Sequence, residues 1–224
     1  MKTLISRREF SSTLGLAMAA LPTLSRAQGA APVEGKHYLR LAQPLPSTPG
    51  KIEVIEFFLY TCQHCFAFDP HVSAWAKQLP ADVSFRRVHV GVGAMHKLHQ
   101  RLMFALESLG RLGDFHESVF KAIHVQRLDL SDEKAITQFA VSLGLEEAKF
   151  KAAFNSFTAN SRMAQSAQLA AAYRAETVPA LGIGGRFLTS PSLAAGPGQS
   201  AAVGHQAALA LSNHLIQQLR GGKA

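Results

Sequence analysis

Residues 54–68 read VIEFFLYTCQHCFAF, an apolar run followed at once by two cysteines that are separated by two residues. Cys62 and Cys65 are the only cysteines of the 224 residues. A disulfide between them would close a very short loop, and the stabilisation that a disulfide provides grows with the length of that loop. A short, accessible disulfide also exchanges readily with thiols. The pair therefore indicates redox chemistry rather than a structural cross-link.

A metal-binding role for the cysteines has less support. Two thiolates fill half of a tetrahedral zinc site, and the sequence contains no second CxxC to complete it. His64 lies between the cysteines and, on a helix, would point away from both. His96 and His99 have i, i+3 spacing, but two histidines without a carboxylate are a weak metal signature. We expect no metal, and no cofactor apart from a disulfide between Cys62 and Cys65.

The N-terminus has the features of an export signal. It begins with three basic residues (Lys2, Arg7 and Arg8) and continues with a short, mildly apolar stretch and a small-x-small cleavage site that ends at Ala27. The paired arginines resemble a twin-arginine signal, and an ordinary Sec signal is the alternative. Either route predicts removal of residues 1–27 and a mature protein in the periplasm. A dithiol pair can act as an oxidant in such an oxidising compartment.

Composition places the rest of the chain among globular proteins. Apolar residues make up 47% of the sequence, and the roughly 197 residues left after the leader are enough for one well-buried domain. The formal charge of +8 includes four basic residues and one acidic residue of the leader, so the mature chain carries about +5. Its basic residues are dispersed and are not interleaved with aromatic side chains, which argues against nucleic-acid binding. No second apolar segment reaches transmembrane length.

Segments with strand character lie on both sides of a helical middle. Residues 52–59 are almost continuously apolar, as in a central buried strand, and residues 83–90 alternate well enough to form a second strand. A helix is predicted to begin at the CxxC and to kink rather than stop at Pro70. Two apolar runs within residues 180–188 surround a Gly-Gly turn, which predicts a β-hairpin.

The middle of the chain keeps helical spacing over residues 97–173. Asp114 and Ser131 are the predicted N-caps of two of its helices, and a break is predicted near Asn155 and Ser156. Three segments complete the pattern: an extended arm over residues 28–50, a Pro/Gly/Ser loop over residues 189–200 and a final amphipathic helix over residues 205–219.

The order of these segments resembles that of the DsbA family of periplasmic thiol–disulfide oxidoreductases, over essentially the whole mature sequence. The motifs that carry the resemblance are VIEFF at 54–58, CQHCFAF at 62–68, HV at 89–90, VPA at 178–180 and GRF at 185–187. The resemblance implies an α/β architecture, a thioredoxin-like fold with an inserted all-α domain. The implied divisions are an export signal at 1–27, a first thioredoxin-like part at 28–96, a helical insertion at 97–173 and a second thioredoxin-like part at 174–224.

The resemblance also implies roles for the residues of the motif. Cys62 would be the exposed nucleophile, with its thiolate favoured by the helix N-terminus, and Cys65 would be the buried resolving cysteine. His64 matches the histidine with which the family stabilises that thiolate. Gln63 departs from the pattern, because the best-known members have proline there. This dipeptide tunes the redox potential, so the departure concerns the strength of the oxidant.

Further positions match the family outside the CxxC. Pro179 matches a cis-proline that lies beside the disulfide and holds extended substrate, and Val178 before it matches the oxidases rather than the isomerases. Glu56 and Arg87 match an acid and a base that form a proton relay beneath the active site. Arg86 competes with Arg87 for the inward position.

These features predict a periplasmic oxidoreductase that donates its disulfide to newly exported proteins through a mixed disulfide at Cys62. The expected partners are unfolded or partly folded exported proteins with free thiols, and a DsbB-type membrane protein that reoxidises the pair. A monomer is expected, since no dimerisation segment precedes the fold. One alternative is a reductase or isomerase on the same fold. The other is a peptide-binding holdase whose cysteines are incidental.

Overall fold

The structure of the chain is a computed structural model that describes residues 31–46, 48–91 and 93–222. The predicted export signal at 1–27, with its paired arginines, lies outside the described residues. None of the helices in the described part is both long enough and apolar enough to cross a membrane.

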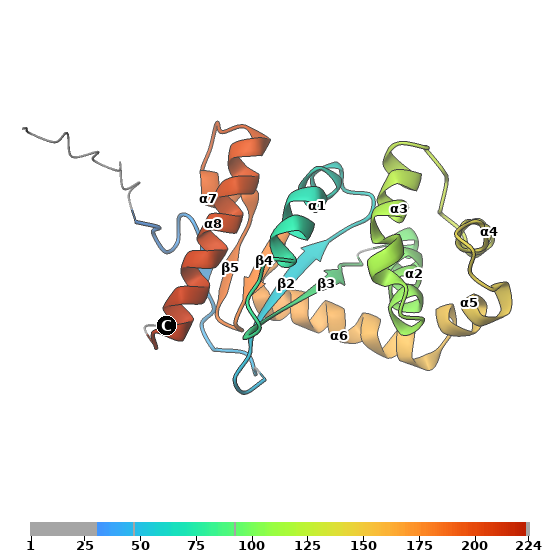
Figure 1. Cartoon of the computed structure of the whole chain (residues 1–224), viewed down its shortest axis with the longest axis horizontal. Helices are drawn as coiled ribbons and strands as arrows, with labels where there is room; N and C mark the ends of the chain where they lie inside the picture. The colour runs from blue at the N-terminus through green and yellow to red at the C-terminus, as the bar shows by residue number, and fades with distance from the viewer. Residues whose placement is uncertain (1–30, 47, 92, 223–224) are drawn as a thin grey trace, which may run out of the picture. The chain divides into compact units, whose positions relative to one another are not determined.

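A mixed sheet of five strands organises the fold, in the order β1-β5-β4-β2-β3 (Figure 1). The strands are β1 (Leu39–Arg40), β2 (Ile52–Phe58), β3 (Val83–His89), β4 (Ala180–Ile183) and β5 (Phe187–Thr189). β2 and β3 run parallel, and the other neighbouring pairs are antiparallel. Five consecutive residues of β2 are buried, as expected of an interior strand that is covered on both faces.

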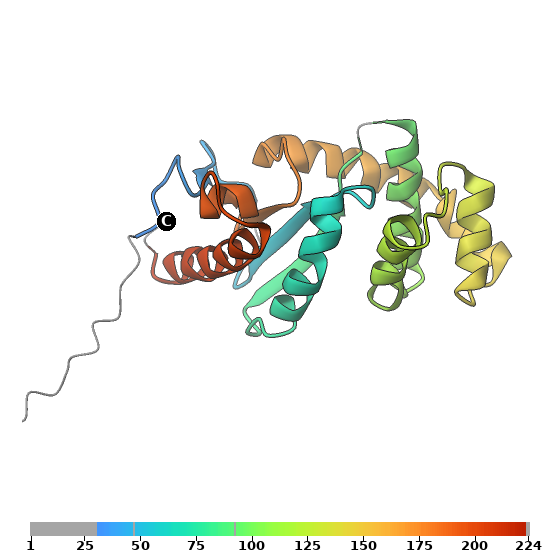
Figure 2. The ribbon, with the colours of Figure 1, turned by 90° about the horizontal axis from the view of Figure 1, so that it is seen from above.

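Helices cover both faces of this sheet (Figure 2). The covering helices are α1 (Gln63–Ala76), α6 (Phe157–Tyr173) and α8 (Ala201–Arg220). Successive side chains of a strand point to opposite faces, so Val54 packs against α1 and α8, whereas Ile55 and Phe57 pack against the end of α6. α1 continues past Pro70 without stopping. Glu56 is the one charged residue within the buried run of β2, and it faces the same side as Val54.

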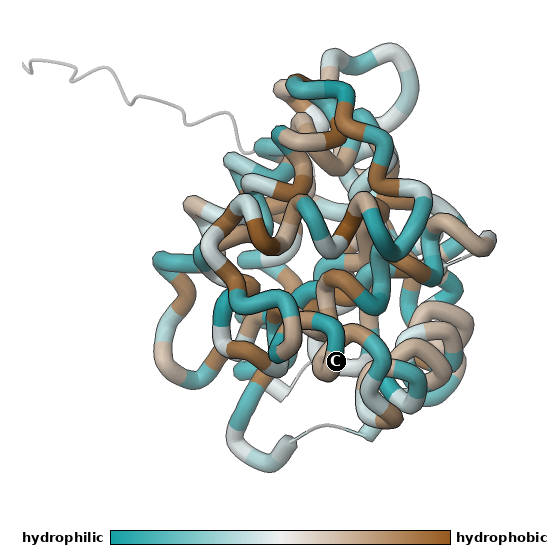
Figure 3. Tube along the Cα trace, turned by 90° about the vertical axis from the view of Figure 1, so that its right-hand side faces the viewer, coloured by the Kyte–Doolittle hydropathy of each residue, from teal (hydrophilic) through white to brown (hydrophobic). Residues whose placement is uncertain are grey.

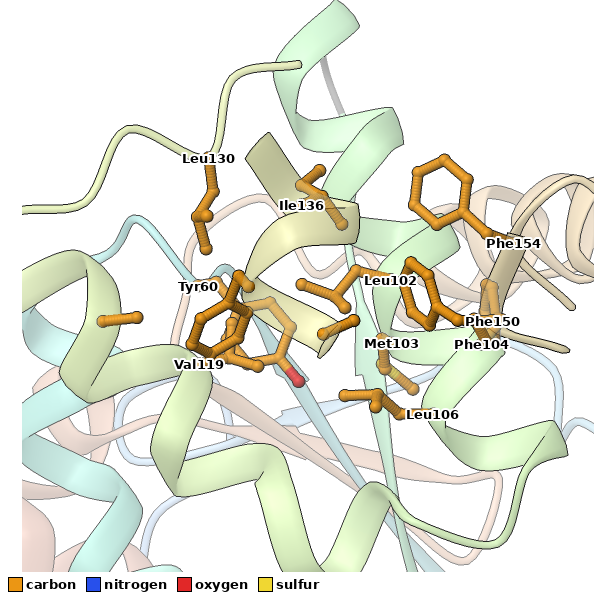
Figure 4. Close-up of a cluster of buried hydrophobic side chains, with 14 of the residues drawn as sticks. Tyr60, Leu102, Met103, Phe104, Leu106, Val119, Leu130, Ile136, Phe150 and Phe154 are labelled. Carbon is orange, nitrogen blue, oxygen red and sulfur yellow. The ribbon is translucent and has the colours of Figure 1, made fainter. Parts of the chain in front are cut away.

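An all-α block lies between β3 and β4. Before α6 it contains α2 (Ala94–Ser108), α3 (Leu112–His124), α4 (Glu133–Ser142) and α5 (Glu147–Phe154). Hydrophobic and hydrophilic residues alternate along these helices (Figure 3), which gives each of them a buried face. Their apolar side chains form one cluster that Tyr60, from the turn before α1, also enters (Figure 4). The predicted break at Asn155 and Ser156 is confirmed, because these two residues separate α5 from α6.

Two predicted helix caps are wrong. α3 begins before Asp114, which lies in its first turn and pairs with Arg111 over 2.7 Å. A carboxylate in the first turn interacts favourably with the helix dipole without being the cap. α4 is capped by Asp132 rather than Ser131, because the Asp132 carboxylate accepts the N–H of Ala135 over 2.8 Å.

The predicted loop over residues 189–200 contains a short helix, α7 (Pro191–Ala195). Ser190 caps it by accepting the N–H of Leu193 over 3.1 Å. α8 likewise starts at Ala201, earlier than predicted, because Ser200 caps it. Both differences have one cause. Serine is a good N-cap, but a Pro/Gly/Ser-rich composition predicts a loop, in which Ser190 and Ser200 are not recognised as the caps of two helices.

The N-terminal arm is attached to the β4–β5 hairpin. Gly184 and Gly185 lie in the turn of this hairpin, with φ values of +57° and +65°. A Cβ at Gly185 would lie 2.7 Å from the carbonyl oxygen of Leu45, so glycine is required where the arm passes. The N–H of Leu45 donates to the Gly185 carbonyl over 2.8 Å, and Leu39 of β1 pairs with Leu188 of β5. Within the predicted extended arm, Leu39 and Arg40 thus form an edge strand of the sheet.

Candidate active site

Cys62 caps the N-terminus of α1 with its own side chain. Its backbone is extended (φ −81°, ψ 116°), and its sulfur accepts the N–H of Cys65 over 3.3 Å. A side-chain oxygen of Ser, Thr, Asp or Asn usually fills this position. Cys62 reaches this position because β2 ends at Phe58 and the chain then makes a turn, which is closed by the N–H of Cys62 donating to the carbonyl of Leu59 over 3.1 Å. A half-buried sulfur therefore lies at the positive end of the helix.

This position lowers the pKa of the Cys62 thiol to about 6. The hydrogen bond with the Cys65 side chain lowers the pKa most, and partial burial opposes it. The backbone N–H groups of Cys65 and His64, and the charge of His64, lower it further. The thiolate is the reactive form of cysteine, and at pH 7 most of Cys62 is in that form.

Cys65 has the opposite character. It is fully buried in the cluster that contains Phe58 and Tyr60. Burial raises the pKa of the Cys65 thiol far above its ordinary range, and the hydrogen bond with Cys62 and the charge of Glu56 act in the same direction. Both cysteines are free in the structure. The pair thus combines an accessible thiolate with a buried thiol that donates a hydrogen bond to it.

The loop before β4 faces Cys62. The peptide bond between Val178 and Pro179 is cis, as predicted, and the Val178 carbonyl oxygen lies 3.7 Å from Cys62 Sγ. A cavity of about 460 Å³ borders this loop. Its lining includes His64, Val178, Pro179, Ala195, Pro197 and His205. His64 itself is exposed. The CxxC, the cis-proline loop and the segment from α7 to α8 therefore surround one concave surface.

Glu56 and Arg87 form a second group of polar side chains, in the interior of the protein. They are directly opposite each other on β2 and β3, and Arg87 Nε donates to Glu56 Oε2 over 2.9 Å. Arg87 Nη2 also donates to Asp69 of α1 over 3.0 Å and to Ser73 over 2.7 Å. Burial raises the pKa of Glu56 to about 7, against the lowering effect of Arg87. A carboxyl group that titrates near neutral pH can accept and release a proton at physiological pH.

Asp69 connects this group to residues that sequence reasoning missed. Asp69 Oδ1 lies 3.3 Å from Nε2 of His116, and Nδ1 of His116 lies 3.0 Å from the hydroxyl of Tyr60. Burial opposes ionisation of Asp69, but His116 and Arg87 hold the pKa of its carboxyl below the ordinary value. Burial also lowers the pKa of His116. A sequence signal for Asp69 exists, since it is an acidic residue among apolar positions of a helix, whereas His116 lies in a distant segment.

Gln63 is exposed and meets a residue of the helical block. Its Oε1 lies 3.1 Å from Nδ1 of His124, the last residue of α3. No sequence signal indicated His124, because 61 residues separate it from Gln63.

His96 and His99 do not form a metal site together. Nε2 of His96 lies 3.3 Å from the hydroxyl of Thr61, and Nε2 of His99 lies 2.9 Å from the carbonyl of Leu130. The described residues contain no group of three or more His, Cys, Asp or Glu side chains that could hold a metal ion.

Comparison with known proteins assigns this arrangement to a family. The model of the DSBA-like thioredoxin domain matches residues 53–196, which include the CxxC, the helical block and the cis-proline loop. The chain belongs to the DsbA family. The predicted α/β fold, thioredoxin-like with a helical insertion, is thereby confirmed.

Relatives in the DsbA family cover almost the whole chain. A thiol:disulfide interchange protein DsbA of Bordetella parapertussis is 43% identical over 190 residues, which is 83% of this chain and 88% of the relative. The protein of the same name from Pseudomonas aeruginosa strain PAO1 is 36% identical over 214 residues, or 95% and 97% of the two chains. The crystal structure of Pseudomonas aeruginosa DsbA matches with a TM-score of 0.78 and 34% identity, covering 85% of this chain and 96% of that one.

Membership of the DsbA family does not show the role of each residue, but the geometry of this chain shows which of the predicted site residues lie together. The structure brings Cys62, Cys65 and Val178 into contact and places His64 and Pro179 on the adjoining cavity. Glu56 and Arg87 contact each other instead, and of the two only Glu56 acts on the pair, because its charge raises the pKa of the buried Cys65. Their roles, like that of Gln63, stay predictions.

Proposed function

We propose that this protein, a thiol–disulfide oxidoreductase of the DsbA family, donates a Cys62–Cys65 disulfide to exported proteins that carry free thiols. The difference between the two cysteines carries this proposal. Cys62 is accessible and has a pKa near 6, whereas Cys65 is buried with a raised pKa. A low-pKa thiol is a good leaving group in thiol–disulfide exchange. In a mixed disulfide, the bond between Cys62 Sγ and the substrate sulfur therefore breaks readily, with Cys62 leaving as a thiolate.

The reaction transfers two electrons from the substrate dithiol to the protein. A substrate thiolate attacks Cys62 Sγ, the Cys62–Cys65 bond breaks, and Cys65 leaves as a thiolate that takes up a proton. A second substrate thiolate then attacks the substrate sulfur of the mixed disulfide, and Cys62 leaves as a thiolate. The substrate is oxidised to a disulfide and the protein is left as the dithiol. Glu56, whose pKa is about 7, is the proposed proton donor and acceptor for the buried Cys65.

The cavity beside Pro179 supports binding of an extended chain next to Cys62. It is bordered by residues 177–179 of the cis-proline loop and by the segment from α7 to α8, and it lies on the side of Cys62 that faces the Val178 carbonyl. Extended peptides bind through backbone hydrogen bonds combined with pockets for side chains. An unfolded client fits these requirements better than a folded one.

The periplasm is the proposed location, and a DsbB-type membrane protein is the proposed reoxidant. The basic, apolar and small-x-small pattern of residues 1–27 supports export. Replacing Arg7 and Arg8 by lysine keeps their charge and removes the arginine pair that the twin-arginine route requires. Retention of this variant in the cytoplasm would support that route, and unchanged export would assign the leader to Sec.

The proposed activity is tested with the oxidised protein and a reduced, unfolded client of known disulfide pattern. We expect one client disulfide to form per molecule of protein, with the Cys62→Ala/Cys65→Ala double variant inactive. A client that forms no disulfides with the oxidised protein, while the reduced protein reduces disulfides, would assign the chain to the reductases. Rearrangement of scrambled disulfides without net oxidation would indicate an isomerase, and full function of the double variant a holdase.

A further inference from the structure

His124 holds the chain on both sides of Cys62. Its Nε2 lies 2.7 Å from the backbone carbonyl oxygen of Tyr60, two residues before the cysteine. Its Nδ1 lies 3.1 Å from Oε1 of Gln63, the residue after the cysteine and the first residue of α1. One imidazole from α3 therefore bridges the turn that leads into the redox helix and the helix itself.

The imidazole is fixed in this position by aromatic packing. The ring of Phe66, in the first turns of α1, stacks on it with centroids 4.8 Å apart and an angle of 6° between the planes. Phe120, one turn earlier on α3, lies 6.0 Å from it. Phe66 and Phe120 also pack against each other. The ring nitrogens are thus held at their two partners rather than free to turn toward solvent.

The chemistry of the two contacts gives them different roles. A carbonyl oxygen only accepts, so Nε2–H donates to Tyr60. The Gln63 amide contains both a donor and an acceptor, so it can partner Nδ1 whether or not that nitrogen carries a proton. The side chain of Gln63, within the CxxC, is therefore tied to α3 of the helical block.

We propose that His124 is a positioning residue for the redox pair, acting through Gln63 to set the redox equilibrium of Cys62 and Cys65. The N–H groups of His64 and Cys65 lower the pKa of Cys62 only while the first turn of α1 presents them to its sulfur. The contacts of His124 with Tyr60 and Gln63, called the His124 clamp below, maintain that geometry in the form with free cysteines. This inference rests on the proposed function, since it concerns the equilibrium of the same pair.

The proposal predicts a measurable loss of thiolate stabilisation when the clamp is removed. His124→Phe keeps an aromatic ring for Phe66 and removes both nitrogens. One hydrogen bond contributes about 1 kcal/mol, or about fivefold in an equilibrium constant. We expect His124→Phe to shift the equilibrium with glutathione about fivefold toward the disulfide and to raise the pKa of Cys62, followed by the ultraviolet absorbance of the thiolate. Lys121→Ala, an exposed change one turn earlier on the same helix, serves as the control and should change neither value.

A double-mutant cycle tests whether the effect passes through Gln63. His124→Phe should shift the equilibrium less in a Gln63→Ala background than in the unmodified chain. Equal shifts in both backgrounds, or an unchanged equilibrium and Cys62 pKa with only a lower Tm, would overturn the proposal. If His124→Phe does not fold, His124→Gln, whose amide can still donate to the Tyr60 carbonyl in place of Nε2 but offers no counterpart of Nδ1 to Gln63, replaces it in the same cycle. An unmodified chain that fails to exchange with glutathione would contradict the proposed function instead.

Discussion

Arg87 donates to the carboxylate of Glu56 over 2.9 Å where only 1% of the Glu56 surface is exposed. The same guanidinium donates to Asp69, so one cation serves two buried carboxylates. Arg86, the neighbouring residue, instead pairs with Glu53 at the surface. The register of β2 against β3 decides between the two arginines, because it places Glu56 opposite Arg87 and Ile55 opposite Arg86.

The two arginines provide a matched pair of variants. Arg87→Met leaves Glu56 and Asp69 without their cation, and breaking a buried ion pair in this way costs about 3–5 kcal/mol. Arg86→Met removes an exposed pair, which contributes less than about 1 kcal/mol. We expect urea unfolding to show a large loss of stability for the first variant and a small one for the second. Equal losses would show that the buried network does not stabilise the fold.

Glu56 should make the free energy of unfolding depend on pH. Its pKa is raised to about 7 in the folded state, so between about pH 4.5 and 7 the folded state binds more protons than the unfolded state. Stability from this group is therefore fully present below about pH 4.5 and is lost as pH rises through 7, by about 3 kcal/mol.

Glu56→Gln removes that dependence while Asp69 still partners Arg87. The free energy of unfolding of the unmodified protein, relative to that of the variant, should therefore be higher at pH 5 than at pH 8. A difference that stays constant over this range would contradict a neutral Glu56 at low pH.

The order of attack can be read from trapped intermediates. Cys62 is accessible and Cys65 is fully buried, so a client thiolate reaches only Cys62. Cys65→Ser should accumulate mixed disulfides with clients, because the resolving thiol is missing, whereas Cys62→Ser should accumulate few. Non-reducing electrophoresis after acid quenching separates the adducts. Equal trapping by the two variants, or trapping only by Cys62→Ser, would contradict the assignment of Cys62 as the cysteine that bonds to the client.

The reduced protein should be more stable than the oxidised one at neutral pH. A Cys62 pKa near 6, against ~8.5 for an unfolded thiol, gives at most about 1.4 kcal/mol at pH 7, and partial exposure reduces this to about 1 kcal/mol. The loop-closure gain from so short a bridge is about 1–2 kcal/mol, and strain in the closed loop offsets it.

The pH dependence of that difference follows from the lowered pKa. The stabilisation is fully present above ~8.5 and is lost as pH falls through 6. Thermal melts of both redox forms should therefore differ more at pH 8 than at pH 5. A higher midpoint for the oxidised form at pH 8 would favour a reductase.

The fold could be predicted from the sequence because its signals are local. An apolar strand, a CxxC at a helix start and a Val-Pro before a hairpin each occupy a few adjacent residues, and their order identifies the architecture. The choice between Arg86 and Arg87 was not available in the same way. Only the first residue and the last two of β3 are buried, so its alternation is too weak to give the inward face, and the register had to come from the structure.

The polar contacts around the pair were also beyond the sequence. His116 and His124 lie on α3, far along the chain from the motif, and their partners depend on how α3 packs beside α1. A histidine on an amphipathic helix gives no sign of such a contact, because its spacing is the same whether it meets solvent or a neighbouring helix.

The pairing of Leu39 with Leu188 has a consequence for how the chain acquires its structure. It joins strands that are about 150 residues apart, whereas α2 contacts α3, α5 and α6 within its own segment. Contacts between distant residues form slowly, since a long loop must close first. We expect the helical block to consolidate early and the sheet to close last, once the C-terminal hairpin has emerged. A newly made chain would therefore expose both cysteines to other thiols before the folded core enclosed one of them.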